Sequence, residues 1–192
     1  GMICYEFKGG TGTASRCCSI NGEVYTTGVL VQSNFGTRND LNIRGVPVGR
    51  HLTGNTLWKT PTHPRSQGSI IAIAITDAPL LPIQMQRIAR RIGLGVGRTG
   101  TPSENGSGDI FLAFSTANPG IDQSSSANGS RSIPNEKIVP LFEATVQATE
   151  EAIINALVAG RTMTGNGGNT VTAIDHRELR RVLSEFNRLQ AP

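Results

Sequence analysis

The run at residues 68–77, GSIIAIAITD, constrains the fold of this chain more than any other stretch of it. It is continuously apolar and rich in isoleucine, which predicts a strand buried on both faces in the middle of a sheet. Beyond it, a proline suited to a first helical turn is followed by Met85, Ile88 and Ile92 at helical spacing. This spacing predicts a helix over residues 82–93, about three turns long.

Other elements follow from similar patterns. Residues 23–34 are β-branched and lie between Asn-Gly and Gly punctuation, which predicts one or two hairpin strands, and residues 110–116, IFLAFST, predict a second buried strand. Small apolar residues at helical spacing predict a long helix over 134–160, and residues 176–189 predict a final helix with Asp175 as its N-cap. Strands that alternate with amphipathic helices over 192 residues indicate a single layered α/β domain.

The composition excludes several classes of partner. With 37% hydrophobic and 17% charged residues the chain can bury one globular core. Its formal net charge is +4, but the basic residues are dispersed and aromatic residues are only 5% of the chain, which argues against nucleic-acid binding. No run reaches the roughly 18 apolar residues that a membrane span needs. We therefore expect neither nucleic acid nor a membrane as a partner.

The cysteines and histidines do not form a metal-binding pattern. Cys4, Cys17 and Cys18 are an odd number without ligand spacing, so we expect buried, reduced thiols. His51 and His63 lie in a long Gly- and Pro-rich stretch without a third ligand at helical spacing, so we expect surface imidazoles. The chain is therefore predicted to need no metal or cofactor.

The strongest candidate for chemistry lies in residues 100–109, GTPSENGSGD, directly before the second apolar run. Ser107 stands between Gly106 and Gly108, which lack the Cβ atoms that would crowd its hydroxyl and its backbone nitrogen. A following strand would hold both groups rigidly, so Ser107 is the candidate nucleophile. Composition alone also allows the alternative of an ordinary Gly/Ser/Asn turn.

Three segments resemble the L-aminopeptidase/D-esterase family, whose members include the β-peptidyl aminopeptidases: GMICYEFKGGTGTASR at 1–16, TDAPLLP at 76–82 and NGSGDIFLAFST at 105–116. The resemblance implies a layered αββα sandwich like that of the ornithine acetyltransferases, with an N-terminal part of the sandwich preceding this chain. It also implies a precursor that cuts itself between Gly106 and Ser107. Residues 1–106 would then belong to an α-chain, and residues 107–192 would form a β-chain.

The activity that the resemblance implies is that of a serine aminopeptidase or amidase of the N-terminal-nucleophile type. It would release N-terminal residues from short peptides, amides or esters through an acyl-enzyme on Ser107, and it would form a homo-oligomer of αβ units. An N-terminal serine can use its own α-amino group, with a reference pKa of about 7.7–8.0, as a base in place of histidine. Asp109 is expected to brace the loop or the new N-terminus rather than to perform chemistry. We expect a cytoplasmic location, with the periplasm as the alternative.

Two other functions stay open. The first is an N-acyl transferase related to the ornithine acetyltransferases, although those enzymes use a threonine nucleophile where this chain has Ser107. The second is an inactive structural or binding relative.

Further site residues come mainly from the resemblance. It places Thr149 beside the nucleophile as a proton relay and Glu151 as a carboxylate that holds the serine amine. Residues two apart on a regular helix do not share a face, so either the helix is distorted or Glu150 takes the role, unless all belong to a solvated stripe. Asn34 is the candidate oxyanion-hole donor, with an ordinary turn asparagine as the alternative. Glu6 is the candidate for binding the substrate amine, or a half-exposed strand carboxylate.

Overall fold

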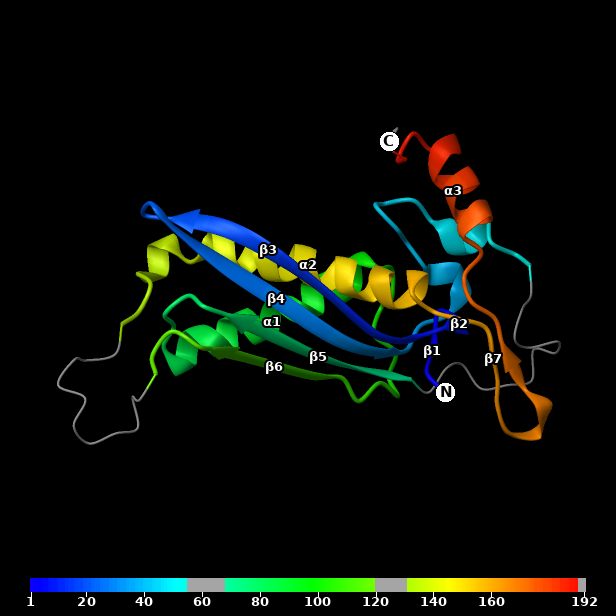
Figure 1. Ribbon diagram of the computed structural model, residues 1–192, viewed down its shortest axis with the longest axis horizontal. Coiled ribbons are helices and arrows are strands. Elements are labelled where there is room, and N and C mark those ends of the chain that lie inside the picture. The colour runs from blue at the N-terminus through cyan, green and yellow to red at the C-terminus, as the bar shows by residue number, and fades with distance from the viewer. Residues whose placement is uncertain (55–67, 120–130, 190–192) are drawn as a thin grey trace.

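The computed structural model describes residues 1–54, 68–119 and 131–189, and its centre is a four-stranded sheet with two long helices on one face (Figure 1). The strands lie in chain order: β3 (Gly10–Ile20), β4 (Glu23–Asn34), β5 (Ser69–Thr76) and β6 (Ile110–Ser115). The pairs β3–β4 and β4–β5 are antiparallel, whereas β5–β6 is parallel. The helices are α1 (Pro82–Arg98), which connects β5 to β6, and α2 (Val139–Val158).

Shorter elements gather mainly at one end of this sheet (Figure 1). Two small antiparallel pairs are formed by β1 (Ile3–Cys4) with β2 (Phe7–Lys8) and by β7 (Met163–Thr164) with β8 (Thr170–Val171). The remaining elements are α3 (His176–Glu185) and the 3₁₀ turns η1 (Arg38–Asp40), η2 (Val48–Arg50), η3 (Asn135–Lys137) and η4 (Asn166–Gly168).

The long hairpin of β3 and β4 confirms the strand predicted at 23–34. Its turn is Asn21-Gly22, and both residues adopt positive φ angles of 53° and 84°. A two-residue turn of this kind matches the twist of the strands it joins and sets their register, which pairs Ile20 with Glu23. The register then runs unbroken to Gly10 and Ser33.

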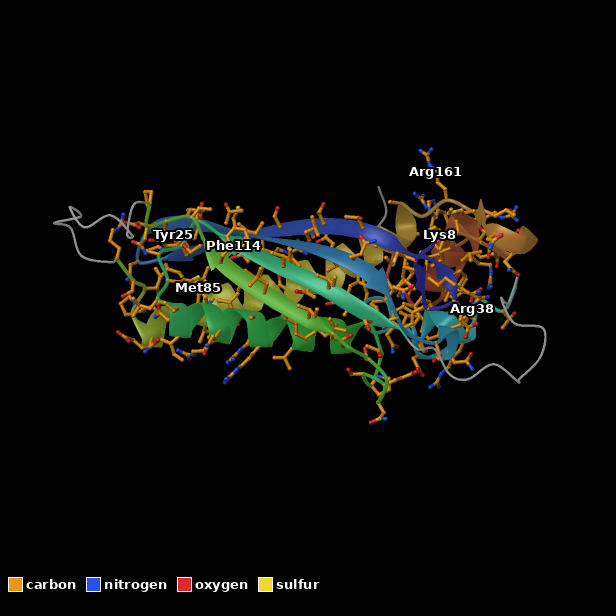
Figure 2. All side chains as sticks on the ribbon, turned by 90° about the horizontal axis from the view of Figure 1, so that it is seen from below. Lys8, Tyr25, Arg38, Met85, Phe114 and Arg161 are labelled. Carbon is orange, nitrogen blue, oxygen red and sulfur yellow. The ribbon has the colours of Figure 1, made fainter. Side chains whose placement is uncertain are left out.

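β5 lies in the middle of the sheet as predicted, but it is not buried on both faces. Ile70, Ala72 and Ala74 pack beneath the helices, whereas Ile71 and Ile75 on the opposite face are 45% and 38% exposed. Figure 2 shows the strands edge-on with helices on one side only. The uncovered face carries several large apolar side chains: Leu30, Ile71, Ile75, Ile110, Leu112 and Phe114. The two runs, of β5 and β6, are apolar on both faces, but the described residues cover only one of them, so the expected burial of β6 is also wrong for its outer face.

α1 is longer than predicted, because it continues through Gly93 and two later glycines to Arg98. Close packing explains the continuation. A Cβ on Gly95 would lie 2.5 Å from the Cβ of Thr149 and 2.7 Å from the carbonyl oxygen of Val146 in α2. Gly95 therefore allows α1 and α2 to approach closely, and this tertiary packing outweighs the weak helix propensity of glycine.

α2 and α3 largely follow the prediction. α2 ends at Val158, close to the expected stop at Gly160. Asp175 caps α3, since its side chain accepts hydrogen bonds from the backbone nitrogens of Arg177 and Glu178 at 2.8 and 3.1 Å. α3 ends at Glu185, four residues before the predicted end, and Asn187 beyond it adopts a φ of 54°.

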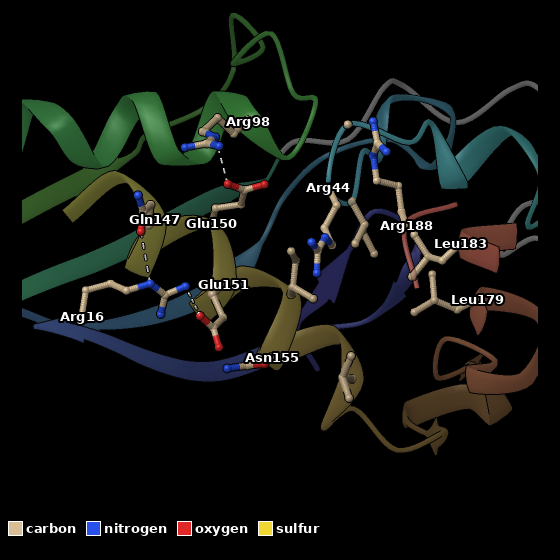
Figure 3. Close-up of a pocket in the computed structure, with 14 residues that line it drawn as sticks. Arg16, Arg44, Arg98, Gln147, Glu150, Glu151, Asn155, Leu179, Leu183 and Arg188 are labelled. Carbon is tan, nitrogen blue, oxygen red and sulfur yellow. Dashed lines mark hydrogen bonds and ion pairs between the residues drawn. The ribbon is translucent and has the colours of Figure 1, made fainter. Parts of the chain in front are cut away.

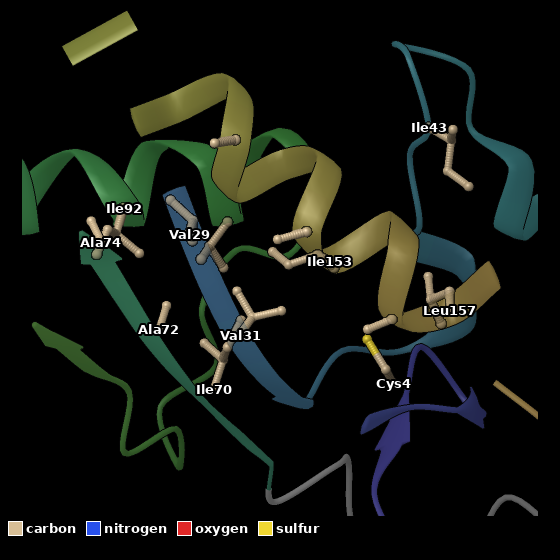
Figure 4. Packing of buried hydrophobic residues seen from close by; sticks show 14 of the residues in the cluster. Cys4, Val29, Val31, Ile43, Ile70, Ala72, Ala74, Ile92, Ile153 and Leu157 are labelled. Carbon is tan, nitrogen blue, oxygen red and sulfur yellow. The ribbon is translucent and has the colours of Figure 1, made fainter. Parts of the chain in front are cut away.

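The core fills the layer between the sheet and the two helices (Figure 4). Val31 of β4, Ile70 of β5 and Ile153 of α2 are at most 1% exposed there. α2 lies directly on β3, because a Cβ on Gly12 would be only 2.0 Å from the carbonyl oxygen of Ala152. The prediction that the small-residue side of this helix packs closely on a sheet is confirmed.

The three cysteines are free, but only Cys4 is buried. Burial raises the pKa of the Cys4 thiol to about 12. The expectation of a buried thiol is wrong for Cys17, which is exposed, because successive residues of β3 point to opposite faces.

His51 is exposed, with its ring 5.3 Å from that of Phe186, and His63 lies outside the described residues. Three or more His, Cys, Asp or Glu side chains do not group into a metal-binding cluster anywhere in the described ranges. A separate observation is that none of the helices described here is both long and apolar enough to cross a membrane.

Candidate active site

The loop that carries Ser107 leaves the C-terminal end of α1 and enters β6. A turn closes around the predicted cleavage position, because the backbone nitrogen of Ser107 donates to the carbonyl oxygen of Glu104 at 2.9 Å. Gly106 is exposed and Ser107 is half-buried. The positive φ angles of the loop belong to Gly100 (105°) and Ser103 (60°), which lie before this turn.

The hydroxyl of Ser107 is bound to a carboxylate. Ser107 Oγ donates to Asp109 Oδ1 at 2.5 Å, and the same oxygen accepts from the backbone nitrogen of Ile70 at 3.1 Å. The other carboxylate oxygen of Asp109 accepts from Ser103 Oγ at 3.3 Å. Asp109 thus ties the loop to the start of β5, which confirms the expected bracing of the loop.

Asn34 lies at the same end of the sheet as Ser107. It is the last residue of β4 and the Cα partner of Ser69, whose Oγ accepts from the backbone nitrogen of Gly108 at 3.0 Å. Asn34 Oδ1 accepts from the backbone nitrogen of Ile3 at 2.9 Å, and Nδ2 has no hydrogen-bond partner in the part of the chain that the structure describes. The side-chain amide of Asn34 is therefore held through its oxygen, and its NH₂ group is a hydrogen-bond donor that no described group uses.

The N-terminal segment closes the same region. The backbone nitrogen of Tyr5 donates to the carbonyl oxygen of Phe35 at 2.8 Å, next to Asn34. The phenol of Tyr5 lies 2.6 Å from Thr99 Oγ1 at the start of the Ser107 loop. Desolvation of this buried phenol raises its pKa. Three segments that are far apart in the sequence therefore meet here, and the sequence analysis missed the connecting residues Tyr5, Ser69 and Thr99.

The signal for Ser69 was present, since it heads the apolar run of β5, where strand ends meet. Tyr5 and Thr99 gave no signal, because their hydrogen bond joins positions 94 residues apart.

Glu6 belongs to this N-terminal segment, but its charge already has a partner. Its Oε2 lies 3.9 Å from the Nε of buried Arg38, and its Oε1 accepts from the backbone nitrogen of Arg38 at 3.4 Å. The guanidinium of Arg38 stands 4.0 Å from the ring centroid of Phe7, and burial lowers its pKa. Because a buried cation is costly without a counter-ion, Glu6 has a structural role that the sequence did not reveal.

Thr149 and its acidic neighbours are placed elsewhere. Thr149 is fully buried, and its hydroxyl donates to the carbonyl oxygen of Thr145 at 2.7 Å within α2. Glu151 forms an ion pair with Arg16 of β3. α2 is an uninterrupted α-helix here, so the distortion considered above is not found. Across residues 1–54, 68–119 and 131–189, no hydrogen bond or ion pair joins Ser107 to Thr149 or Glu151.

Figure 3 shows a pocket that the acidic residues of α2 help to line. It has a volume of about 990 Å³, and neither Ser107 nor Asn34 lines it. Glu150 Oε2 lies 2.8 Å from Arg98 Nε, and the Glu151 pair with Arg16 forms another part of the wall. The predicted site residues thus fall into two places, one at the strand ends and one on α2.

The fold and the strand-end site define a layered α/β protein that presents a serine on a loop at the edge of a parallel strand pair. The profile of Peptidase family S58 matches residues 1–171. The chain belongs to Peptidase family S58, which confirms the resemblance on which the site prediction rests.

Similar proteins agree with this assignment. The chain is 48% identical over 203 residues to beta-peptidyl aminopeptidase BapA of Sphingosinicella microcystinivorans, and it covers 51% of that protein. It superposes with a TM-score of 0.88 and 46% identity on an L-aminopeptidase D-Ala-esterase/amidase from Ochrobactrum anthropi, which is described as a prototype of the serine aminopeptidases and a new variant among the Ntn hydrolase fold. That match covers 99% of this chain and 52% of the other.

A third relative is a beta-aminopeptidase from Burkholderia sp., with a TM-score of 0.81 and 41% identity over all of this chain and 53% of the other. These superpositions confirm the predicted α/β fold class. The chain spans about half the length of the relatives it matches.

Proposed function

We propose that this chain carries the nucleophile of a self-processing serine aminopeptidase or amidase, and that the nucleophile is Ser107. The observation that carries the proposal is the Ser107 hydroxyl, which lies 2.5 Å from the Asp109 carboxylate beside an exposed Gly106. A reactive hydroxyl and an accessible peptide bond are thus adjacent in the chain. Membership of Peptidase family S58 and relatives that are named aminopeptidases support the same function.

In this proposal the chain is cut between Gly106 and Ser107, so that residues 1–106 and 107–192 become α- and β-chain portions. The new α-amino group of Ser107 then serves as the base for its own hydroxyl. The amino group takes the hydroxyl proton as the oxygen attacks the substrate carbonyl, and it passes this proton to the leaving amine or alcohol. Water then hydrolyses the acyl-enzyme. No step needs a metal or cofactor.

Asn34 is the proposed oxyanion donor. Its side-chain oxygen is held by Ile3, which leaves its NH₂ group to stabilise a negative oxygen near Ser107. The geometric basis is the contact of Ser69 with both Asn34, as its strand partner, and Gly108, as its hydrogen-bond donor. Removal of one such donor costs on the order of 10²–10³ in kcat.

The proposed substrates are short peptides and amino-acid amides or esters with a free amine. Glu6 is the proposed partner of that amine, and its carboxylate would then be shared with Arg38. Thr149 and Glu151 enter the proposal only through the family resemblance, because their contacts within this chain are with other residues.

We also propose the four-layer αββα arrangement, with a second sheet on the uncovered apolar face of β4, β5 and β6. A face with six large exposed apolar side chains is costly to leave in water.

The proposed assembly is a homo-oligomer of αβ units, which light scattering coupled to size-exclusion chromatography would test.

Intact-mass spectrometry and peptidase assays of the protein and its Ser107→Ala variant test the function. We expect the protein to appear as two chains that separate before Ser107. We expect Ser107→Ala to stay uncut and to lose activity by at least about 10⁴-fold, because one oxygen serves both reactions. Ser103→Ala, in the same loop, is the control and should be cut. An active protein with an intact 106–107 bond would overturn the proposal.

A further inference from the structure

The uncut precursor lacks the base that the mature enzyme would use. Before cleavage the nitrogen of Ser107 belongs to a peptide bond and donates to the carbonyl oxygen of Glu104 at 2.9 Å. An amide nitrogen of this kind has no basic lone pair, so it cannot take the proton of the serine hydroxyl. Self-cleavage therefore needs another group to accept that proton.

The structure places one such group in contact with the hydroxyl. Ser107 Oγ lies 2.5 Å from Asp109 Oδ1, within the distance that proton transfer to a general base requires. Ile70 and Ser103 hold the two carboxylate oxygens at 3.1 and 3.3 Å, so the carboxylate is oriented by both strand and loop. In the described part of the chain, this is the only hydrogen bond of the Ser107 side chain.

We propose that Asp109 is the general base of self-cleavage at the Gly106–Ser107 bond, a role distinct from that of the α-amino group in later turnover. The inference rests on the proposed function, because it assumes that the precursor cuts itself there. It goes beyond the bracing role that the loop contacts establish for Asp109.

The proposed step balances as follows. The Asp109 carboxylate takes the proton of Ser107 Oγ while the oxygen attacks the carbonyl carbon of Gly106. The proton then passes from Asp109 to the nitrogen of Ser107, and the bond between that nitrogen and the Gly106 carbonyl carbon breaks. The product is an ester between Gly106 and Ser107 Oγ with a free amine on Ser107. Water hydrolyses this ester to a Gly106 carboxylate and a free Ser107 hydroxyl.

The step makes Asp109 more important for processing than for turnover. Once the α-amino group of Ser107 is free, it accepts the hydroxyl proton in each later cycle. Replacement of Asp109 should therefore slow the appearance of the two chains more than it slows hydrolysis of substrate by protein that has already been cut.

Asp109→Asn in the full chain tests the proposal. Asparagine keeps a carbonyl oxygen for the Ile70 nitrogen but cannot take a proton. Glu104→Gln is the control, because it removes a different carboxylate of the same loop by the same kind of substitution. Intact-mass spectrometry follows the uncut fraction with time. We expect Asp109→Asn to slow cleavage by about 10²-fold or more, and Glu104→Gln to stay within about threefold of the original rate.

A second variant separates chemistry from structure. Asp109→Ala leaves a gap in which added formate can replace the missing carboxylate, so we expect formate to accelerate its cleavage in proportion to concentration and to have no effect on Ser107→Ala. Cleavage of Asp109→Asn within threefold of the original rate would overturn the inference. A slow Asp109→Asn together with an Asp109→Ala that formate does not accelerate would also overturn it. An original chain that stays uncut would instead overturn the proposed function.

Discussion

The strand-end cluster consists of Asn34, Ser69, Ser107 and Asp109, and the α2 stripe consists of Thr149, Glu150 and Glu151. Both contain hydroxyl and carboxylate side chains, but these side chains have different kinds of partner. At the strand ends, Asn34 keeps an NH₂ group without a described partner, and the Ser107 hydroxyl meets a carboxylate on a loop. On α2, the Thr149 hydroxyl is bonded within the helix and Glu151 is paired with Arg16. The comparison teaches that a hydroxyl and a carboxylate close in sequence need not contact each other, because the fold decides which partner each of them bonds.

Asn34→Asp should cause the largest change, because it tests the available donor. The variant keeps an oxygen for the Ile3 nitrogen but replaces the NH₂ group with a second oxygen. We expect kcat/KM to fall by about 10²–10³-fold, while the melting temperature changes little. Asn21→Asp, in the turn at the other end of β4, is the matched control. Equal, small effects of the two variants would remove Asn34 from the site.

Gly100→Ala tests whether the strand-end cluster depends on the close packing of Gly100, at the start of the Ser107 loop, against Asp40. Gly100 has a φ of 105°, and a Cβ there would lie 1.7 Å from the carbonyl oxygen of Asp40. We expect a loss of about 2–4 kcal/mol in the free energy of unfolding, measured by urea titration in the uncut Ser107→Ala background.

Gly97→Ala is the control for this experiment, because a Cβ at Gly97 meets nothing within 4 Å. The substitution lies inside α1 and should stabilise the protein by about 0.5–1 kcal/mol. Similar losses in the free energy of unfolding for Gly97→Ala and Gly100→Ala would show that the packing of Gly100 against Asp40 has no special importance for stability.

Glu151→Gln and Glu150→Gln test the α2 stripe. The family resemblance places Glu151 beside the nucleophile, so we expect Glu151→Gln to lower kcat/KM more than Glu150→Gln. Glu150 is only 15% exposed against 43% for Glu151, so we expect Glu150→Gln to lower the melting temperature more, although each pair is worth at most about 1 kcal/mol. Negligible changes of kcat/KM in both variants would leave the two carboxylates as anchors of the helix.

The smallest expected effect is that of EDTA. We expect incubation with the chelator to leave peptidase activity unchanged, because neither the strand-end cluster nor the α2 stripe brings together three groups of the kind that bind metal. Loss of activity that added Zn²⁺ restores would contradict this prediction and would require a ligand set that involves other parts of the protein.

Local patterns determined most of the elements and the candidate nucleophile. Apolar runs predicted β5 and β6, Asn21-Gly22 predicted the hairpin, and Asp175 predicted the start of α3, because each signal depends on near neighbours in the chain. The predicted end of α1 at Gly93 was wrong. The helix continues because Gly95 packs closely against α2, about 50 residues away in the sequence.

By itself, the sequence determined that the chain alternates apolar strands with amphipathic helices and that Ser107 stands on a glycine-flanked loop before a strand. Only the tertiary structure decided which other residues meet this loop. The register of β4, β5 and β6 brings Asn34 and Ser69 to the loop, and helix packing directs Thr149 toward α1. Hydrophobic periodicity records which face of an element is buried, but it does not record the partner, because apolar burial is nondirectional and many partners satisfy it equally.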